Sequence, residues 1–193
     1  MVDILSIQPN EIAFDVDGVV ADTFRYFVRS ARNQYGCAFD YEDITEYDFR
    51  KVIDIEDATS EAIIQRALED PIHCGIEPLP GAVSSLTRLA GKAPLLFVTA
   101  RPEPDAILAW LLHYLEDVPE GKIRLEATGT GENKPAVLKA YNVAYFVEDC
   151  LETGFLLEKA PVTPIIFEQP WNRKPHPFPR VSTWNQLSSM VAW

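Results

Sequence analysis

Ile12-Ala13-Phe14-Asp15-Val16-Asp17-Gly18 places two carboxylates at the end of a short apolar run, with a glycine directly behind them. The side chains of a strand alternate between its faces, so Asp15 and Asp17 emerge on the same side if the strand continues that far. If the chain turns instead, Gly18 supplies a backbone that tolerates unusual dihedral angles. Two like charges this close repel each other and are costly to desolvate unless a cation lies between them. The alternative interpretation is a solvated Asp-Asp-Gly turn after a strand.

Composition and charge limit the classes of protein to consider. A length of 193 residues suffices for one substantial core with a small insertion, and a hydrophobic fraction of 47% argues against disorder. The formal net charge of -12 disfavours a nucleic-acid polymer or an anionic membrane surface as a partner. A phosphorylated substrate would therefore need local cations, which a metal ion and a few well-placed basic side chains can supply.

The cysteines and the start of the chain indicate a cytoplasmic protein. Cys37, Cys74 and Cys150 lie far apart with no paired spacing, which favours reduced thiols over a disulfide framework or a zinc site. Residues 1–4 have neither a basic region nor a long apolar stretch, so we expect no signal peptide. The sequence also holds no apolar run of the length that a membrane span needs.

Apolar runs without alternation recur along the chain and are typical of strands buried on both faces of a parallel sheet. They are Ile12–Phe14, Pro94–Val98, Ile123–Ala127, Tyr145–Val147 and Pro164–Phe167. Stripes at helical spacing in residues 83–90, 107–115 and 137–141 separate most of these runs. This alternation predicts an α/β fold with a doubly wound, Rossmann-like parallel sheet, whose reactive groups gather at the carboxyl ends of the strands. An antiparallel sheet with loose helices fits the apolar runs less well.

Residues 22–78 interrupt this rhythm, because they contain no convincing strand. One amphipathic helix begins near Phe24, with Asp22-Thr23 as its expected cap, and ends at Gly36. A second helix includes residues 63–68, with Thr59 or Ser60 as its expected N-cap. The acidic, aromatic segment 40–49 lies between them. We therefore predict a small helical cap, residues 22–78, inserted after the first strand into a core formed by residues 1–21 and 79–193.

The residues at the ends of the predicted strands form a set that suits phosphoryl transfer. Asp15 and Asp17 end the first strand and Thr99 ends the second, whereas Lys134 follows the third and Glu148-Asp149 end the fourth. One carboxylate can attack phosphorus, and a second can protonate the leaving alkoxide and then activate water. Mg²⁺ can bridge the acids and the phosphate, while a hydroxyl and an ammonium group hold the transferring oxygens.

Four strings carry a resemblance to the haloacid dehalogenase superfamily. FDVDGVVADT resembles its first motif, LLFVTAR its second with Thr99 as the hydroxyl, and FVEDC its fourth, while Lys134 matches the third. Lys139 is a neighbouring candidate for this lysine, and Lys134 is preferred because it precedes a predicted helix. The match covers essentially the whole chain. An acid at position 17 is absent from the dehalogenases and phosphonate-cleaving relatives, so the resemblance implies a phosphatase.

The resemblance also implies a role for each matched residue. Asp15 would be the nucleophile and a metal ligand, and Asp17 the general acid/base with its main-chain carbonyl on the metal. Thr99 and Lys134 would bind phosphate. Asp149 would ligate Mg²⁺, and Glu148 would support the metal directly or through water, a choice that the replacement of the commoner aspartate by glutamate leaves open.

The predicted cap limits the range of possible substrates. Its pattern, together with residues 44–49 and 169–172, is similar to the 5′(3′)-deoxyribonucleotidase-like branch and its bacterial relatives. An aromatic cap can stack a base, and the candidates are Tyr47, Phe49 and Trp171, whereas Phe24 and Phe27 fall on an apolar helix stripe and are expected in the core. Arg101 is expected to reach a phosphate or a cap carboxylate. Arg25, Arg29 and Arg32 are expected to form a solvated face paired with acids.

We therefore expect a Mg²⁺-dependent phosphomonoester hydrolase that works through an aspartyl-phosphate on Asp15, with a nucleoside monophosphate as substrate. An alternative keeps the mechanism and changes the substrate to a sugar phosphate or another small phosphorylated metabolite. A third interpretation is a non-catalytic binding protein on the same fold, which would predict a disrupted motif. The chain is expected to act as a monomer or homodimer.

Overall fold

A parallel sheet organises the protein in the computed structural model, which describes residues 6–193. Within these residues the sheet has six strands in the order β3-β2-β1-β4-β5-β6, and every neighbouring pair is parallel. The strands are β1 (Ile12–Phe14), β2 (Leu95–Thr99), β3 (Ile123–Ala127), β4 (Tyr145–Glu148), β5 (Thr163–Phe167) and β6 (Arg180–Val181). The predicted α/β, doubly wound fold is confirmed. The expectation about residues 1–4 lies outside the described residues.

The direction of strand addition reverses at β1, which lies between β2 and β4. From β1 the chain adds β2 and β3 on one side and later adds β4, β5 and β6 on the other. In such sheets the carboxyl ends of the strands diverge at the reversal point and leave room for a ligand. Asp15 immediately follows β1, so this topology places it at the reversal point.

Helices cover both faces of the sheet because successive strand residues point in opposite directions. Phe14 and Phe97 belong to the larger core cluster, together with side chains of α3 (Ala82–Ala90), α4 (Asp105–Tyr114) and α7 (Trp184–Ser189). Ala13 and the neighbours of Phe97 on β2 belong to the second cluster, with side chains of α5 (Lys134–Ala140) and α6 (Leu151–Leu157). The protein therefore has three layers.

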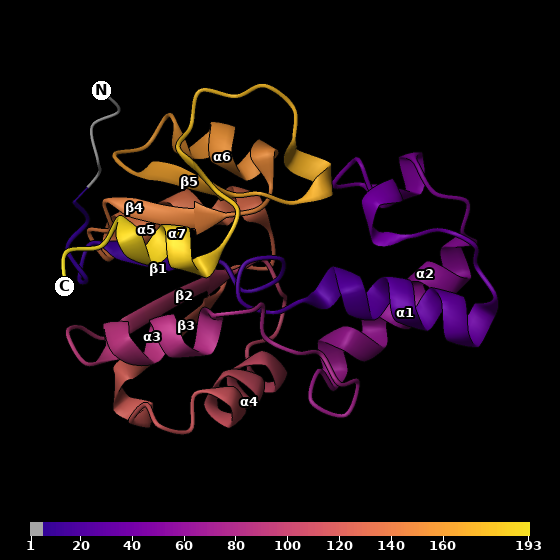
Figure 1. Ribbon diagram of the computed structural model, residues 1–193, viewed down its shortest axis with the longest axis horizontal. Helices are drawn as coiled ribbons and strands as arrows, with labels where there is room; N and C mark the ends of the chain where they lie inside the picture. The colour runs from indigo at the N-terminus through magenta and orange to yellow at the C-terminus, as the bar shows by residue number, and fades with distance from the viewer. Residues whose placement is uncertain (1–5) are drawn as a thin grey trace.

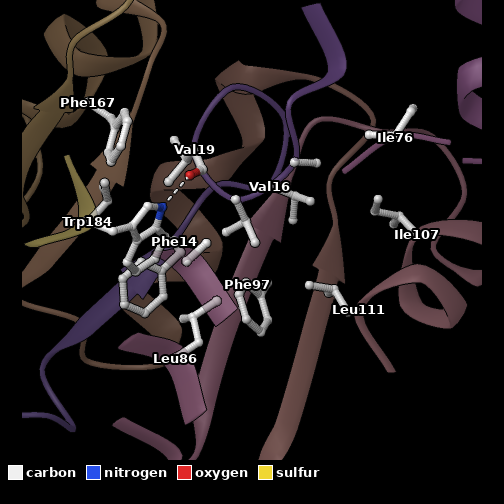
Figure 2. Packing of buried hydrophobic residues seen from close by; sticks show 14 of the residues in the cluster. Phe14, Val16, Val19, Ile76, Leu86, Phe97, Ile107, Leu111, Phe167 and Trp184 are labelled. Carbon is white, nitrogen blue, oxygen red and sulfur yellow. Dashed lines mark hydrogen bonds between the residues drawn. The ribbon is translucent and has the colours of Figure 1, made fainter. Parts of the chain in front are cut away.

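Trp184 connects the larger core cluster to the loop after β1. It is fully buried, and its indole Nε1 donates a hydrogen bond to the Val19 carbonyl at 2.9 Å. Its ring lies 5.5 Å from that of Phe14, which in turn lies 6.0 Å from that of Phe97. Figure 2 shows these rings packed beneath the loop that carries Val16 and Val19. The core thus fixes the loop that begins at Asp15.

A helical segment follows this loop and lies to one side of the sheet (Figure 1). It comprises α1 (Thr23–Tyr35), the 3-10 turns η1 (Tyr41–Asp43) and η2 (Phe49–Lys51), and α2 (Asp57–Glu69). Helix α1 ends as expected, because Gly36 adopts φ 70° and its N–H bonds the carbonyls of Ala31 and Arg32. Helices α1 and α2 pack against each other. Further 3-10 turns are η3 (Glu120–Lys122), η4 (Gly131–Asn133) and η5 (Pro170–Asn172).

Several local expectations are wrong. Helix α2 begins two residues before Thr59, and the Ser60 hydroxyl bonds the Asp57 carbonyl inside the helix. Asp22 makes no side-chain cap of α1, because its carboxylate pairs with Arg25. The second strand lies one residue later than Pro94–Val98.

Among residues 6–193 no helix is long and apolar enough to cross a membrane.

Replacing Phe97 by alanine should lower the free energy of unfolding by about 3–5 kcal/mol, because the side chain is fully buried between the sheet and its helices. Urea denaturation followed by circular dichroism measures this change. Phe155→Ala is the matched control, since Phe155 is 42% exposed. Equal losses in the two variants would contradict this account of the core.

Candidate active site

Four charged side chains meet at the carboxyl ends of β1 and β4. Asp15 follows β1, Glu148 ends β4, Asp149 follows it, and Lys134 is the first residue of α5. The Lys134 Nζ lies 2.7 Å from Asp15 Oδ2 and 2.9 Å from Glu148 Oε2. All four residues are at most 4% exposed. Charged groups are rarely buried this completely unless they are paired, so the cluster is built around its single ammonium group.

One ammonium group leaves this cluster of three acids with excess negative charge. Burial raises the pKa of Asp15 well above its usual value, even though the Lys134 charge acts to lower it. Burial likewise raises the pKa of Asp149, and the neighbouring charges of Glu148 and Asp15 raise it further. Burial therefore opposes full ionisation of this cluster, and a second cation would reduce that cost.

The cluster fits a divalent cation. Asp15, Glu148 and Asp149 each offer a carboxylate oxygen within 4.8 Å of the others. Asp149 Oδ1 is buried and, among the described residues, has no hydrogen-bond partner. A buried oxygen without a partner is costly, and coordination to a cation would satisfy it. The donor set consists of hard oxygens, which Mg²⁺ prefers.

Gly18 allows the loop after β1 to lie against these acids. It adopts φ 74°, a left-handed conformation that side chains disfavour, and its N–H bonds the Ala21 carbonyl at 2.9 Å. A Cβ at this position would overlap the Asp149 carboxylate. Position 18 therefore needs glycine for two reasons: its backbone dihedral angle is left-handed, and the Asp149 carboxylate leaves no room for a side chain.

Arg101 holds the second aspartate, Asp17. Its Nε lies 2.9 Å from Asp17 Oδ2 and its Nη2 lies 2.8 Å from Asp17 Oδ1, while the Thr23 hydroxyl also donates to Oδ1. Burial acts to raise the pKa of Asp17, but Arg101, the Thr23 hydroxyl and the Lys134 charge together outweigh it, and the pKa lies below its usual value. Arg101 Nη1 also donates to the Ala67 carbonyl of α2 at 3.0 Å. In this structure Arg101 contacts an aspartate of the loop after β1 and the backbone of α2, where a phosphate or a cap carboxylate was expected.

The remaining predicted phosphate-binding groups lie at the same edge of the sheet. Thr99 ends β2 and is 1% exposed, and its hydroxyl accepts a hydrogen bond from the Arg101 N–H at 3.2 Å. Of the two candidate lysines, Lys134 lies among the acids, whereas Lys139 is exposed on α5. The structure thus brings Asp15, Thr99 and Lys134 to one edge.

A cavity of about 440 Å³ opens beside Asp17 and Arg101. Its walls are predominantly apolar and include Phe24, Phe27, Tyr47, Phe49, Ile63 and Leu68. Tyr47 also lines a second cavity of about 400 Å³ that reaches Lys134. Burial raises the pKa of Tyr47, and the nearby charge of Asp149 adds to this effect.

Some of the other candidate residues lie where the sequence predicted them, and others do not. Phe27 is buried as expected, whereas Phe24 is only partly buried. Trp171 does not line the apolar cavity; it is 3% exposed, and its Nε1 donates to Asp149 Oδ2 at 3.1 Å. Among the arginines of α1, Arg25 pairs with Asp22 and Arg32 with Asp40, as expected, while Arg29 donates to the carbonyls of Cys74 and Gly75.

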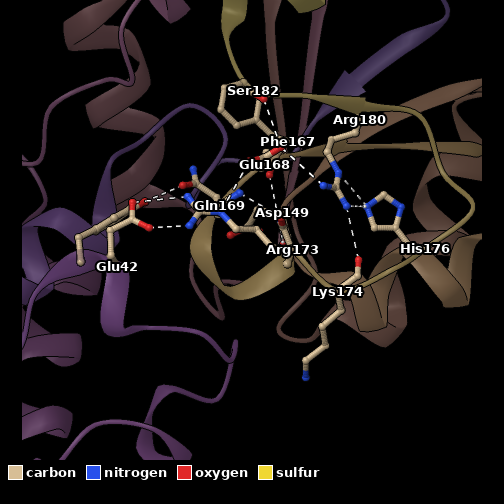
Figure 3. Close-up of polar contacts among 12 residues, drawn as sticks. Glu42, Asp149, Phe167, Glu168, Gln169, Arg173, Lys174, His176, Arg180 and Ser182 are labelled. Carbon is tan, nitrogen blue, oxygen red and sulfur yellow. Dashed lines mark hydrogen bonds and ion pairs between the residues drawn. The ribbon is translucent and has the colours of Figure 1, made fainter.

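Two residues of the 169–172 segment have a place at the site that the sequence alone did not assign to them. Asn172 Nδ2 donates to the Asp149 carbonyl at 2.8 Å, and Gln169 Nε2 donates to the Gly18 carbonyl at 2.7 Å. Figure 3 shows Gln169 and Asp149 within one network of polar contacts. Their position in the sequence could have identified them as site candidates. Both residues follow β5 and so lie at the same edge of the sheet as the ends of β1 and β4.

Lys134→Met removes the only ammonium group among the described residues of the cluster and leaves buried carboxylates facing one another. At neutral pH we expect the free energy of unfolding of the metal-free protein to fall by about 3–5 kcal/mol in urea denaturation. Without the lysine, the already raised pKa of Asp15 rises further, so the folded state binds more protons than the unfolded state and the loss shrinks as the pH falls. The exposed Lys139→Met is the control, and an equal loss there would contradict this reading.

Comparisons with known proteins identify the family of this chain. The sequence model of the family described as "5' nucleotidase, deoxy (Pyrimidine), cytosolic type C protein" matches residues 9–193. A curated nucleotidase of Clostridium acetobutylicum is 21% identical over 182 residues, which cover 93% of this chain and 92% of that protein.

Solved structures show the same fold. A haloacid dehalogenase-superfamily hydrolase from Ehrlichia chaffeensis superposes with a TM-score of 0.56 at 14% identity, over 94% of this chain and 95% of that one. A subfamily IA hydrolase from Geobacter sulfurreducens gives a TM-score of 0.52 at 18% identity, over 89% and 93%. Because the family match spans nearly the whole chain, the protein belongs to the type C 5′-nucleotidase family and is a phosphatase of the haloacid dehalogenase superfamily.

Proposed function

We propose that this protein is a Mg²⁺-dependent phosphomonoester hydrolase that acts on nucleoside monophosphates through an aspartyl-phosphate on Asp15. The observation that carries this proposal is the position of an apolar, aromatic-walled cavity beside Asp17, next to a second cavity that shares Tyr47 with it and reaches the Lys134 of the Asp15–Lys134 pair. The Asp15–Lys134 pair suits the phosphoryl group, and the apolar cavity suits a flat, apolar leaving group such as a nucleoside. The names of the matching family and of the curated relative support a nucleotide substrate.

The proposed reaction divides one displacement at phosphorus into two. A carboxylate oxygen of Asp15 attacks phosphorus, the bond to the leaving oxygen breaks, and Asp17 gives that oxygen a proton. Because the Arg101 charge acts to lower the pKa of Asp17, this acid must take up the proton from solvent before the attack. Asp17 then takes a proton from water, which attacks the aspartyl-phosphate and releases inorganic phosphate and free Asp15. Thr99 and Lys134 hold the transferring oxygens throughout.

A bound Mg²⁺ would neutralise negative charge between the acids and the phosphate. Asp15 and Asp149 would hold it with their side chains, and Asp17 with its main-chain carbonyl. Glu148 is assigned a supporting role, because Oε2 faces Lys134 and Oε1 accepts the N–H groups of Asp149 and Cys150, both at 3.1 Å. This arrangement orients the lysine and the turn that carries Asp149.

Residues 22–78 are proposed to act as the cap that selects the substrate. Their α1, η2 and α2 supply most of the cavity wall, with Tyr47 and Phe49 as the side chains that would contact a base. A sugar phosphate would leave several hydroxyl groups against apolar side chains, which is unfavourable without hydrogen bonds. We also propose a cytoplasmic location, which the free Cys37, Cys74 and Cys150 support.

Asp15→Asn removes the attacking carboxylate and nearly preserves the shape of the side chain. We expect phosphate release from an aryl phosphate to fall by about 10³-fold or more, with an unchanged far-ultraviolet circular dichroism spectrum. A colorimetric phosphate assay with Mg²⁺ measures the rate. Exposed Asp105→Asn, on α4, controls for the loss of one carboxylate. Residual activity near that of the unmodified protein would defeat the assignment of Asp15.

Phe49→Ala tests the substrate class. The KM for thymidine monophosphate should rise by about 10-fold, because stacking of a base on an aromatic ring contributes roughly 1–3 kcal/mol. The KM for a hexose phosphate should change little. Phe155→Ala, distant from the cavity, is the matched control. If KM rises equally for both substrates, or if the hexose phosphate is the better substrate of the unmodified protein, the nucleoside assignment is wrong.

A further inference from the structure

The segment after β5, Gln169-Pro170-Trp171-Asn172, holds Asp149 from two directions. Trp171 Nε1 donates to Asp149 Oδ2 at 3.1 Å, and Asn172 Nδ2 donates to both the Asp149 and the Phe167 carbonyls at 2.8 Å. Trp171 and Asn172 are at most 3% exposed. One short segment therefore fixes both the backbone and the side chain of this acid.

These hydrogen bonds distinguish the two carboxylate oxygens of Asp149. The indole N–H can only donate, so it engages Oδ2 as an acceptor and favours the ionised acid. Oδ1 stays buried and has no hydrogen-bond partner within the described part of the chain. With Oδ2 fixed by the indole, the carboxylate cannot rotate freely, and Oδ1 is the oxygen left for a cation. Partners of this kind, one step beyond the ligands, set the orientation and affinity of metal-binding carboxylates.

The ring of the same indole contacts the helical segment. The Trp171 ring stacks on Phe24 of α1 with centroids 4.0 Å apart and an angle of 29° between the rings. Tyr41 of η1 meets its edge at 5.8 Å. The Tyr41 hydroxyl also donates to Gln169 Oε1 at 2.7 Å, while Gln169 Nε2 reaches the Gly18 carbonyl. The segment thus touches Asp149, the loop after β1 and the helical segment together.

Ion pairs extend this contact toward the surface. Arg173 pairs with Glu42 at 2.6 Å, and Lys174 pairs with Glu46 at 2.6 Å. Figure 3 shows Arg173 extending from the end of this segment toward Glu42, which lies across the gap between the two ribbons. Such exposed pairs contribute little individually. The stack of the buried Trp171 ring on Phe24 is the contact through which a displacement of α1 would reach Asp149.

We propose that Trp171 is a positioning residue that orients Asp149 toward the cation and couples cation binding to the seating of α1. The inference rests on the proposed function, because it takes the cluster of acids as a Mg²⁺ site. If the seated helix favours the bound cation, the bound cation must favour the seated helix by the same factor. The aromatic side chain expected to stack a base instead connects the cap to the metal site.

Two variants separate the two halves of this coupling. Trp171→Phe keeps an aromatic ring against Phe24 and removes the N–H, whereas Phe24→Leu keeps the N–H and removes the aromatic stack. The probe is Mn²⁺, whose binding to the protein without substrate is followed by electron paramagnetic resonance. Trp171→Phe should weaken Mn²⁺ binding by about 10-fold, and Phe24→Leu by about 3-fold. Trp193→Phe is the matched control, because Trp193 packs against Arg88 far from the acids.

Kinetics provides the second measurement. The phosphatase activity of Trp171→Phe should recover at high Mg²⁺, with the KM for the phosphate ester close to that of the unmodified protein. A structural defect would instead leave activity low at every Mg²⁺ concentration. Unchanged Mn²⁺ affinity in Trp171→Phe overturns the positioning role, and unchanged affinity in Phe24→Leu overturns the coupling to α1. If the unmodified protein binds no Mn²⁺, the proposed function fails together with this inference.

Discussion

The buried contact of Lys134 with Asp15 and Glu148 is the constraint to which the rest of the site conforms. An ammonium group can be kept out of water only where carboxylates surround it, and these carboxylates are themselves tolerable only around a cation. The parallel sheet meets both demands, because the ends of β1 and β4 deliver two acids side by side and the first turn of α5 delivers the lysine. This arrangement leaves the charge of a third acid, Asp149, without a matching cation. It also leaves one buried oxygen of Asp149 without a hydrogen-bond partner among the described residues.

Asp17 depends on the helical segment in a way that Asp15 does not. Its carboxylate is held by Arg101, and the same guanidinium reaches the last turn of α2. Thr23, at the start of α1, contributes a further hydrogen bond. The proposed acid/base is therefore bound to both helices, while the proposed nucleophile is bound to the sheet and α5. Seating the helices determines where Asp17 lies relative to Asp15, so the segment proposed to surround the substrate would also organise the proposed proton transfer.

The sequence allowed the sheet and the meeting of Asp15, Thr99, Lys134 and Asp149 to be predicted, because strand ends in a parallel sheet converge whatever the details of packing. Contacts that depend on side-chain direction were not predictable in this way. Trp171 and Arg101 have long side chains that could reach several different acceptors. The sequence does not say which acceptor each of them contacts in the folded protein. Helices α6 and α7 and strand β6 were missed because six or seven residues, or two, hold too little periodicity to stand out.

The close approach of Gly18 to Asp149 has a consequence for how this site tolerates change. A methyl group there would require either that the acid swing out of line or that the loop after β1 reopen, and the Gln169 amide bound to the Gly18 carbonyl resists the second adjustment. Neither adjustment stays local, because the acid and the loop share partners. The lack of space at the Gly18 Cα therefore couples the position of the loop after β1 to the position of Asp149. Substitutions at position 18 would show how far the loop and this acid can move together.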